Sequence, residues 1–346
     1  MVYPPVNRTE LVLKGIDTFL LFGGSPLLAN AAVALKKPGV RVLAVTSPRH
    51  AREPADPAGK PLDRRLKEEG IELLVCERLE DSGVLEKITP TTLGLSMGAA
   101  WIFSKEWIAR FDGRLLNLHG ARLPQDRGGG GFSWYILRGN RVGCCLIHQV
   151  DEGIDTGPIV KFREFLFPAS CRIPRDYMEV YVRQNLEFLS GFFSEMRGGG
   201  SFPLTPQLPY LSTYWPRLST DHHGVIDWSW TGRQIEQFIC AFDEPYRGAS
   251  TWIGDRRLFL KGCDLCLTEG TFHPFQTGLI YRKSGGALFV ASGEGALVIR
   301  SVTDDPGRDA LEELKVGDRF HTPREILEAA RKFRAVYSGA GLTERK

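Results

Sequence analysis

Three residues of the kinds that can move an acyl group onto an amine stand in two short segments of this chain. Asn117 and His119 end the apolar run 115–119, and Asp155 lies in the acidic, glycine-containing run 151–157. A side-chain amide can donate a hydrogen bond to a developing oxyanion, an imidazole can carry a proton, and a carboxylate can hold the imidazole in its charged form. We therefore hypothesise that the three side chains meet around one reactive carbon.

Each of these pieces also has an ordinary structural interpretation. An Asn-x-His pair at a strand end is often structural, an Asp in an Asp-Thr-Gly run commonly forms a turn, and the glycine run 128–131 can be a plain flexible loop. The order of the pieces favours catalysis. A strand ends in Asn-x-His, a Leu-Pro pair and an Arg-Gly-rich loop follow, and then come a helix with Trp134, another strand and the acidic run.

The elements that must position these residues alternate between short apolar runs and helical segments. We expect strands at 17–22, 41–46, 71–76, 92–97, 115–119, 142–150 and 159–167, and helices at 27–36, 63–70, 132–138 and 174–196. This alternation predicts an α/β fold with a doubly wound, Rossmann-like, mostly parallel sheet. Ligands of such sheets bind beyond the carboxyl ends of the strands, where His119 stands. The turn 23–26 lacks the Gly-x-Gly-x-x-Gly spacing, which excludes a dinucleotide site there.

The pattern changes in the last third of the chain. Short strands at 250–260, 278–282, 287–291 and 296–302 predict a small β-barrel-like module. We place a catalytic domain at 1–200, a linker at 201–220 and a β-rich domain at 221–346. The run 322–325 reads as a capping box that opens a terminal helix, with Ile326, Leu327, Ala330 and Phe333 docked on the module.

Composition describes an ordinary globular chain of 346 residues with 42% hydrophobic and 25% charged residues. A formal net charge of +3 gives no reason by itself to expect a nucleic-acid binder. No signal segment and no apolar run of about eighteen residues stand out, so we expect a cytoplasmic location without membrane contact. Seven cysteines at scattered spacings fit reduced thiols. We read Cys263–Cys266 and His222–His223 as structural, and we expect no metal site.

The order of motifs resembles the folate-dependent formyltransferase superfamily, which includes methionyl-tRNA formyltransferases and N-formyltransferases of nucleotide-linked amino sugars. That family reads Asn-x-His-x-Ser-Leu-Leu-Pro-x-x-Arg-Gly, an aromatic helix, Asp-x-Gly-x-Asp-x-Gly, and later Gly-x-Ile-Asp-Trp. The matching residues here are Asn117, His119, Leu123, Pro124, Arg127, Gly128, Trp134, Asp151, Gly153, Asp155, Gly157 and the run 224–228. The chain departs from the pattern at Ala121-Arg122 and at Gly129–Gly131, which leaves loop rigidity and acceptor contacts open.

The resemblance implies a set of roles and a co-substrate. Asn117, His119 and Asp155 would be catalytic, Asp155 would hydrogen-bond His119 and raise its pKa, and 10-formyltetrahydrofolate would supply the formyl group. The residues expected to bind the folate are Trp101, Ile102, Phe103, Asp151, Glu152, Gly153, Ile154 and Asp155. The residues expected to bind the acceptor are Gly24, Ser25, Arg127 and Gly128.

The acceptor remains open between two amines. The loop 49–60 has charges that largely cancel, and Asp304, Asp305, Asp309, Glu312 and Glu313 make the C-terminal part a poor surface for RNA. We therefore favour a nucleotide-linked amino sugar of lipopolysaccharide or O-antigen synthesis over methionyl-tRNA, with no nucleic-acid partner; a homodimer is a candidate assembly. A formyltetrahydrofolate hydrolase is a further alternative, because water needs only the same three residues.

Overall fold

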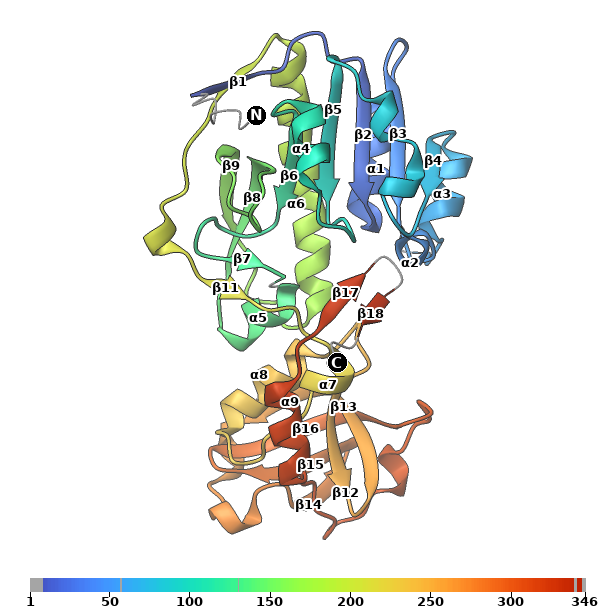
Figure 1. Cartoon of the computed structure of the whole chain (residues 1–346). Helices are drawn as coiled ribbons and strands as arrows, with labels where there is room; N and C mark the ends of the chain where they lie inside the picture. Colours follow the sequence, from blue (N-terminus) through green and yellow to red (C-terminus); the bar gives the residue numbers. More distant parts are fainter. Residues whose placement is uncertain (1–8, 57, 130, 339–340, 344–346) are drawn as a thin grey trace.

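The computed structural model describes residues 9–56, 58–129, 131–338 and 341–343, and it has an α/β part above a β-rich part (Figure 1). The α/β part contains a seven-stranded sheet in the order β4-β3-β2-β5-β6-β8-β9. Its strands are β2 (Thr18–Gly23), β3 (Arg41–Thr46), β4 (Glu72–Val75), β5 (Thr92–Met97), β6 (Leu115–His119), β8 (Val142–Gln149) and β9 (Ile159–Leu166). The first five strands are parallel, whereas β8 and β9 are antiparallel to their neighbours. The sheet is therefore the mostly parallel one that the sequence predicts.

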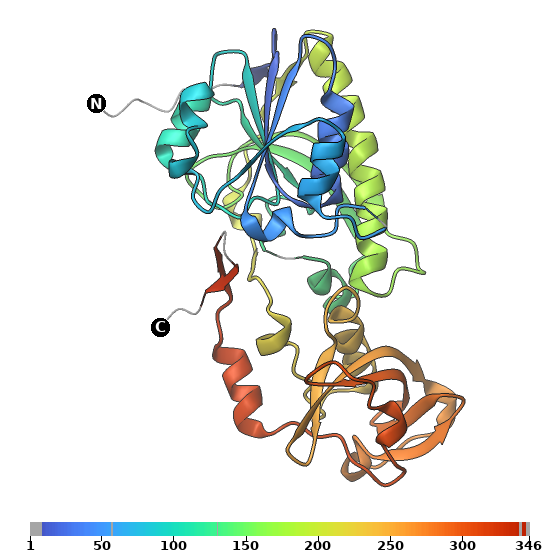
Figure 2. The same cartoon turned by 90° about the vertical axis from the view of Figure 1, so that its right-hand side faces the viewer.

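Helices cover both faces of this sheet, as Figure 2 shows. One face carries α1 (Ser25–Leu35), α3 (Leu62–Glu68) and α6 (Pro174–Arg197), and the other carries α4 (Lys105–Phe111). Strand β2 explains the need for both layers, because Phe19 and Leu21 join the core on one side while Leu20 and Phe22 join the core on the other. A strand that is buried on both faces reads as a continuous apolar run, which is why its position could be predicted.

The segment predicted as a linker follows the α/β part closely. β10 (Ser201–Pro203) pairs with β1 (Glu10–Val12), and β11 (Tyr214–Trp215) pairs in parallel with β7 (Arg127–Gly128). The glycine-rich loop is therefore held by a backbone ladder on one side, and α5 (Gly131–Leu137) follows it. Gly130 lies outside the described residues.

The C-terminal part is built on a five-stranded antiparallel sheet in the order β12-β13-β16-β15-β14. Its strands are β12 (Ala249–Ile253), β13 (Arg256–Cys266), β14 (Ile280–Ser284), β15 (Ala287–Ser292) and β16 (Gly295–Asp304). The segment 319–321 bridges to Trp252 on one side and to Leu279 on the other, which draws the outer strands toward each other as in a barrel. Helix α8 (Gly232–Ala241) packs its buried face on this sheet. The β-rich module predicted from the sequence is confirmed.

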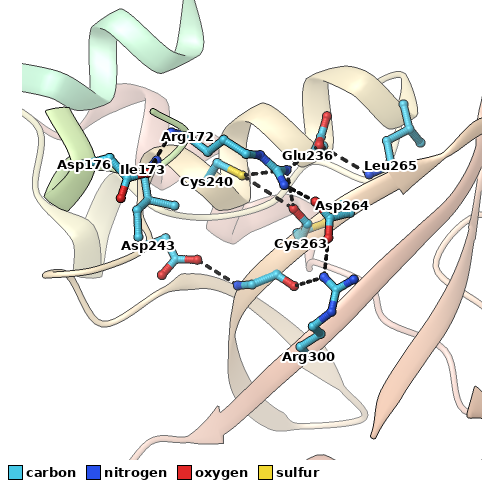
Figure 3. Close-up of polar contacts among 11 residues, drawn as sticks. Arg172, Ile173, Asp176, Glu236, Cys240, Asp243, Cys263, Asp264, Leu265 and Arg300 are labelled. Atoms are coloured by element: carbon cyan, nitrogen blue, oxygen red, sulfur yellow. Dashed lines mark hydrogen bonds and ion pairs between the residues drawn. The ribbon is translucent and has the colours of Figure 1, made fainter. Parts of the chain in front are cut away.

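An arginine of the α/β part joins the two parts, as Figure 3 shows. Arg172 lies in the loop between β9 and α6, and its guanidinium contacts Asp264 on β13, Glu236 on α8 at 2.7 Å and the backbone carbonyl of Cys263 at 2.7 Å. Arg300 reaches Asp264 from β16. Asp176 in the first turn of α6 accepts the backbone N–H groups of Arg172 and Ile173, so the same loop also begins the long helix.

Two sequence expectations in the C-terminal part meet different outcomes. The capping box at 322–325 is wrong: α9 (Arg324–Lys332) begins after Pro323 without a side-chain cap, because the Thr322 hydroxyl donates to the carbonyl of Ile226 at 2.6 Å instead. The apolar face of α9 is only half-buried, and Phe333 stacks on His222 with 3.8 Å between ring centroids.

The paired histidines make contacts of an ordinary structural kind. His223 accepts from the backbone N–H of Ser219 at 2.8 Å, and its other ring nitrogen lies 3.1 Å from the carbonyl oxygen of Phe333. All seven cysteines are free. Across the described part of the chain, no helix is both long and apolar enough to cross a bilayer.

Candidate active site

Strands β6 and β8 bring an amide and two imidazoles to the carboxyl end of the parallel strands. Asn117 and His119 are two residues apart on β6, so their side chains lie on the same face of the sheet. The antiparallel register places His148 of β8 directly opposite Asn117. The Asn117 Nδ2 atom lies 3.1 Å from His148 Nε2, and the two histidine rings are 6.2 Å apart at their centroids.

Asp155 reaches the same place from the loop between β8 and β9. Its backbone lies in the left-handed region, with φ of 53°, and its Oδ2 accepts the N–H of Gly128 at 2.9 Å. Its Oδ1 is 3.8 Å from His119 Nδ1 and 3.6 Å from His148 Nε2. The side chains of His119 and Asp155 keep 13% and 17% exposure, so the group is not sealed from solvent. The three residues singled out from the sequence therefore converge.

The hydrogen bonding of His119 shows which ring nitrogen is free to react. Its Nε2 lies 2.9 Å from the carbonyl oxygen of Asp126, an acceptor, so Nε2 carries the proton and donates it. The lone pair of Nδ1 then faces Asp155. At 3.8 Å the expected hydrogen bond between His119 and Asp155 is not formed.

Burial decides the charge of His119. Loss of solvent lowers the pKa of His119 below its usual value, and this outweighs the Asp155 carboxylate, which raises it. Asp155 raises the pKa of His119 as expected, but burial outweighs this effect, so the charged form of the ring is not favoured at rest. The resting imidazole is neutral near pH 7 and is ready to accept a proton at Nδ1.

Asp155 stays ionised under the same conditions. Burial raises the pKa of Asp155, but the adjacent ring of His148, the charge that His119 carries at acidic pH and the backbone N–H of Gly128 together outweigh burial and lower that pKa to about 2. The carboxylate therefore offers a fixed negative charge to whichever imidazole gains a proton.

His148 also belongs to this group, and the sequence motifs do not single it out. It is only 2% exposed, and its Nδ1 lies 2.7 Å from the carbonyl oxygen of Gln149. The available signal was its place near the end of a strand that leads into the acidic run, but its position opposite Asn117 depends on the strand register.

The ligating atoms of His119, His148 and Asp155 lie within 4.8 Å of one another, a set that could hold a metal ion. The Asn117 amide already occupies the free nitrogen of His148, and each histidine has its second nitrogen on a backbone carbonyl. This arrangement suits proton handling without a metal.

The two segments predicted to hold the folate, 101–103 and 151–155, lie next to each other. Lys105, which begins α4 after the run 101–103, forms an ion pair with Glu152 of the acidic loop at 2.6 Å. Ile102 is 81% exposed and Ile154 is 51% exposed. These solvent-exposed apolar side chains, one on each segment, offer surface for a flat ring.

Other side chains of these two segments make structural contacts within the protein. Trp101 donates from Nε1 to the carbonyl of Glu77 at 2.7 Å. Asp151 accepts from Thr156 at 2.6 Å and from the N–H of Gly153 at 3.2 Å, which fixes the turn. The ring of Phe103 is buried and packs edge-on against Phe22 at 5.1 Å, so only its backbone is available to a ligand.

The four residues predicted to bind the acceptor divide into two pairs. Gly128 contacts Asp155, and Arg127 donates to Gln207 beside it, so this pair lies at the catalytic group. Gly24 and Ser25 lie at the end of β2, and β5 separates that strand from β6. A Cβ on Gly24 would come within 2.8 Å of the His50 side chain, which explains the glycine there.

Comparison with known proteins agrees with this geometry. Residues 19–169 match the formyl transferase family and residues 219–311 match the formyl transferase C-terminal domain. A methionyl-tRNA formyltransferase of Ruminiclostridium cellulolyticum is 24% identical over 300 residues, which span 84% of this chain and 93% of that protein.

Two solved structures share the fold at 17% sequence identity, each over 85% of this chain and 99% of the other. They are WlaRD, a sugar 3N-formyl transferase with dTDP and 5-N-formyl-THF, with a TM-score of 0.60, and an N-formyltransferase of Helicobacter canadensis with folinic acid and dTDP-3-aminofucose, with a TM-score of 0.61. With both family domains matched in order along residues 19–169 and 219–311, the chain belongs to the formyl transferase family.

Proposed function

We propose that this protein transfers the formyl group of 10-formyltetrahydrofolate to the primary amine of a nucleotide-linked amino sugar. The observation that carries the proposal is the convergence of Asn117, His119 and Asp155. The Nδ1 lone pair of His119 faces the carboxylate of Asp155. An amide donor, a neutral base and a fixed carboxylate are what formyl transfer between two nitrogens requires.

The proposed step begins with attack of the neutral amine on the formyl carbon. A C–N bond forms, and the carbonyl oxygen becomes an oxyanion that accepts a hydrogen bond from Asn117. His119 Nδ1 takes a proton from the amine nitrogen, and Asp155 stabilises the resulting imidazolium. The bond from carbon to N10 then breaks as N10 receives this proton, which leaves tetrahydrofolate and a formamide.

The acceptor is proposed on two grounds. The solved structures that share the fold over 99% of their length include two enzymes whose names give a sugar or a dTDP-linked amino sugar. In the loop that follows β3, Arg49 pairs with Glu53 at 2.8 Å, and Lys60 pairs with Glu68 of α3 at 2.5 Å, which leaves little free positive charge for RNA. With such an acceptor, a place in O-antigen or lipopolysaccharide sugar synthesis in the cytoplasm follows.

Methionyl-tRNA is the second candidate, because the curated relative named above is a methionyl-tRNA formyltransferase that aligns over 84% of the chain. The test is a panel of acceptors offered with 10-formyltetrahydrofolate: dTDP-linked 3-amino and 4-amino sugars, UDP-linked amino sugars and charged initiator tRNA. Mass spectrometry detects the formyl adduct of an amino sugar, and release of tetrahydrofolate gives the rate.

We expect a formyl adduct of one sugar nucleotide and no release of tetrahydrofolate in amine-free buffer. Formylation of the tRNA alone would contradict the acceptor, and equal turnover without amine would identify a hydrolase. His119→Ala should abolish transfer while folinic acid still binds; unchanged turnover in that variant would refute the role of His119.

A further inference from the structure

Gln207, in the segment between the two parts of the chain, is hydrogen-bonded both to the loop that carries Asp155 and to Arg127 of the glycine-rich loop. Its Nε2 donates to the carbonyl oxygens of Asp155 at 2.9 Å and Gly157 at 2.7 Å. Its Oε1 accepts from Nε of Arg127 at 3.0 Å and from Nη2 at 2.7 Å. A glutamine has two N–H donors and two acceptor lone pairs, and all four are used here. The amide therefore has one orientation, since a flip would turn the oxygen toward two carbonyls and the NH₂ toward a guanidinium.

The carbonyl that Gln207 holds belongs to a strained residue. Asp155 adopts φ of 53°, a left-handed conformation that is unfavourable for a non-glycine residue and that persists only where the surroundings fix it. The bond from Gln207 fixes the backbone of Asp155, and the bond from Gly128 N–H to Oδ2 fixes the carboxylate.

The second of these bonds also depends on the same segment. Gly128 follows Arg127, which Gln207 grips, and β7 is paired with β11, where the N–H of Gly129 donates to the carbonyl of Trp215 at 3.0 Å. Both restraints on Asp155 therefore run through residues 207–215. Without them the carboxylate has no fixed distance from the imidazoles of His119 and His148.

We propose that Gln207 is a positioning residue for formyl transfer, which sets the place of the Asp155 carboxylate against the two histidines. The role in turnover rests on the proposed function; the effect on Asp155 rests on the hydrogen bonds alone. Gln207 touches no reacting atom and acts through Asp155. Misplacement of a catalytic group by about 1 Å costs on the order of 100-fold in rate, so the position of this amide matters to kcat.

The test compares two variants that differ in which bonds they keep. Gln207→Glu keeps the length and the grip on Arg127 but loses both donors to the carbonyls of Asp155 and Gly157. Arg127→Met removes the guanidinium and leaves both donors. Gln184→Glu is the matched control, because Gln184 also accepts from an arginine, Arg163 at 3.2 Å, away from the site.

We expect Gln207→Glu to lower kcat by about 10- to 100-fold with KM for the amine unchanged within about threefold. Arg127→Met should lose less, and Gln184→Glu should match the unaltered protein. A second readout is the titration of His119 followed by NMR with labelled histidine. Asp155 raises the pKa of His119, so release of its carboxylate should move this titration to lower pH; this readout uses Gln207→Met, which also lacks both donors and adds no charge of its own.

A wild-type kcat in a folded Gln207→Glu variant, together with an unmoved His119 titration in a folded Gln207→Met variant, would overturn the inference and leave the proposed function standing. The opposite failure is separable. If the unaltered protein formylates no amine, the proposed function fails, and the NMR titration together with hydrogen exchange of residues 151–157 still decides whether Gln207 places Asp155. Faster exchange and a shifted titration support the inference. If neither change occurs, the inference is refuted.

Discussion

The proposed chemistry depends on whether His119 is neutral or charged before the amine binds. Burial lowers the pKa of His119 while the Asp155 carboxylate raises it, and His148 and Asp126 are the other ionisable groups that act on the ring. Burial is the larger effect, so His119 should titrate below its usual value of about 6.5. NMR titration of labelled histidine, assigned with His119→Gln, measures this directly.

Substitution of the carboxylate gives the sign of its effect. Asp155→Asn removes the negative charge, and the pKa of His119 should then fall further below its value in the unaltered protein. A rise in that variant would contradict the electrostatic arrangement described above. His321→Ala, at an exposed histidine of the C-terminal part, should leave the His119 titration unchanged.

Asn117 tests the oxyanion role at the same scale. Asn117→Ala removes the donor, and loss of one such donor typically costs about 3 kcal/mol, which is a fall of about 100-fold or more in kcat. Asn117→Asp has nearly the same shape but offers an ionised oxygen in place of the NH₂ group, so it should be at least as poor. Rates at saturating amine decide the matter, and wild-type kcat in either variant would rule Asn117 out.

The catalytic residues differ in how far the sequence reveals them. Asn117, His119 and Asp155 could be predicted because their types and order carry chemistry on their own. His148 could not, since its place beside these residues comes from a cross-strand partner: the register that puts it opposite Asn117 exists only in the folded sheet. The depth of burial that lowers the pKa of His119 is likewise a property of the packed structure and not of the spacing.

At the scale of elements, the parallel strands were the most predictable part, and the reason lies in their burial. β3 and β5 begin and end where their apolar runs do, at Arg41–Thr46 and Thr92–Met97, because helices cover both faces. The short strands β7 and β11 have no such pattern. They form because the interdomain segment lies along the glycine-rich loop, a tertiary contact that a two-residue run cannot signal.

The joint between the two parts can be tested at Arg172. Arg172→Ala leaves Asp264 and Glu236 without their shared guanidinium and removes a bond to the Cys263 carbonyl (Figure 3). The site is partly exposed, so the loss should be modest, about 1–2 kcal/mol of unfolding free energy. Urea unfolding measures it. The control is Arg41→Ala, which breaks the solvent-exposed pair with Glu72 and should cost less than about 1 kcal/mol. Equal losses in the two variants would mean that Arg172 does not stabilise the joint between the two parts.

For the whole molecule, pairing of charges matters more than their number. The acidic residues of the C-terminal part, which the sequence presents as repulsive to RNA, are largely matched: Asp304 pairs with Arg256 and Arg308, and Asp305 pairs with Arg247. Arg49 and Lys60 of the loop after β3 are matched in the same way. The surface is therefore balanced and not acidic, and the argument against a polyanionic partner rests on the lack of clustered free cations among these residues.

The dependence of kcat/KM on salt concentration tests this pairing of surface charges in the intact enzyme. A protein that neutralises 6–10 phosphates loses about 1,000-fold or more in affinity between roughly 50 and 200 mM salt, because bound counterions are released. A sugar nucleotide presents only a diphosphate, so kcat/KM for the amino sugar should fall by less than about tenfold over the same range. The control is an unphosphorylated amino sugar, whose rate should not depend on salt. A steep loss with charged tRNA, together with faster turnover on tRNA at low salt than on any sugar nucleotide, would show that the balanced surface still binds RNA and would reverse the choice of acceptor.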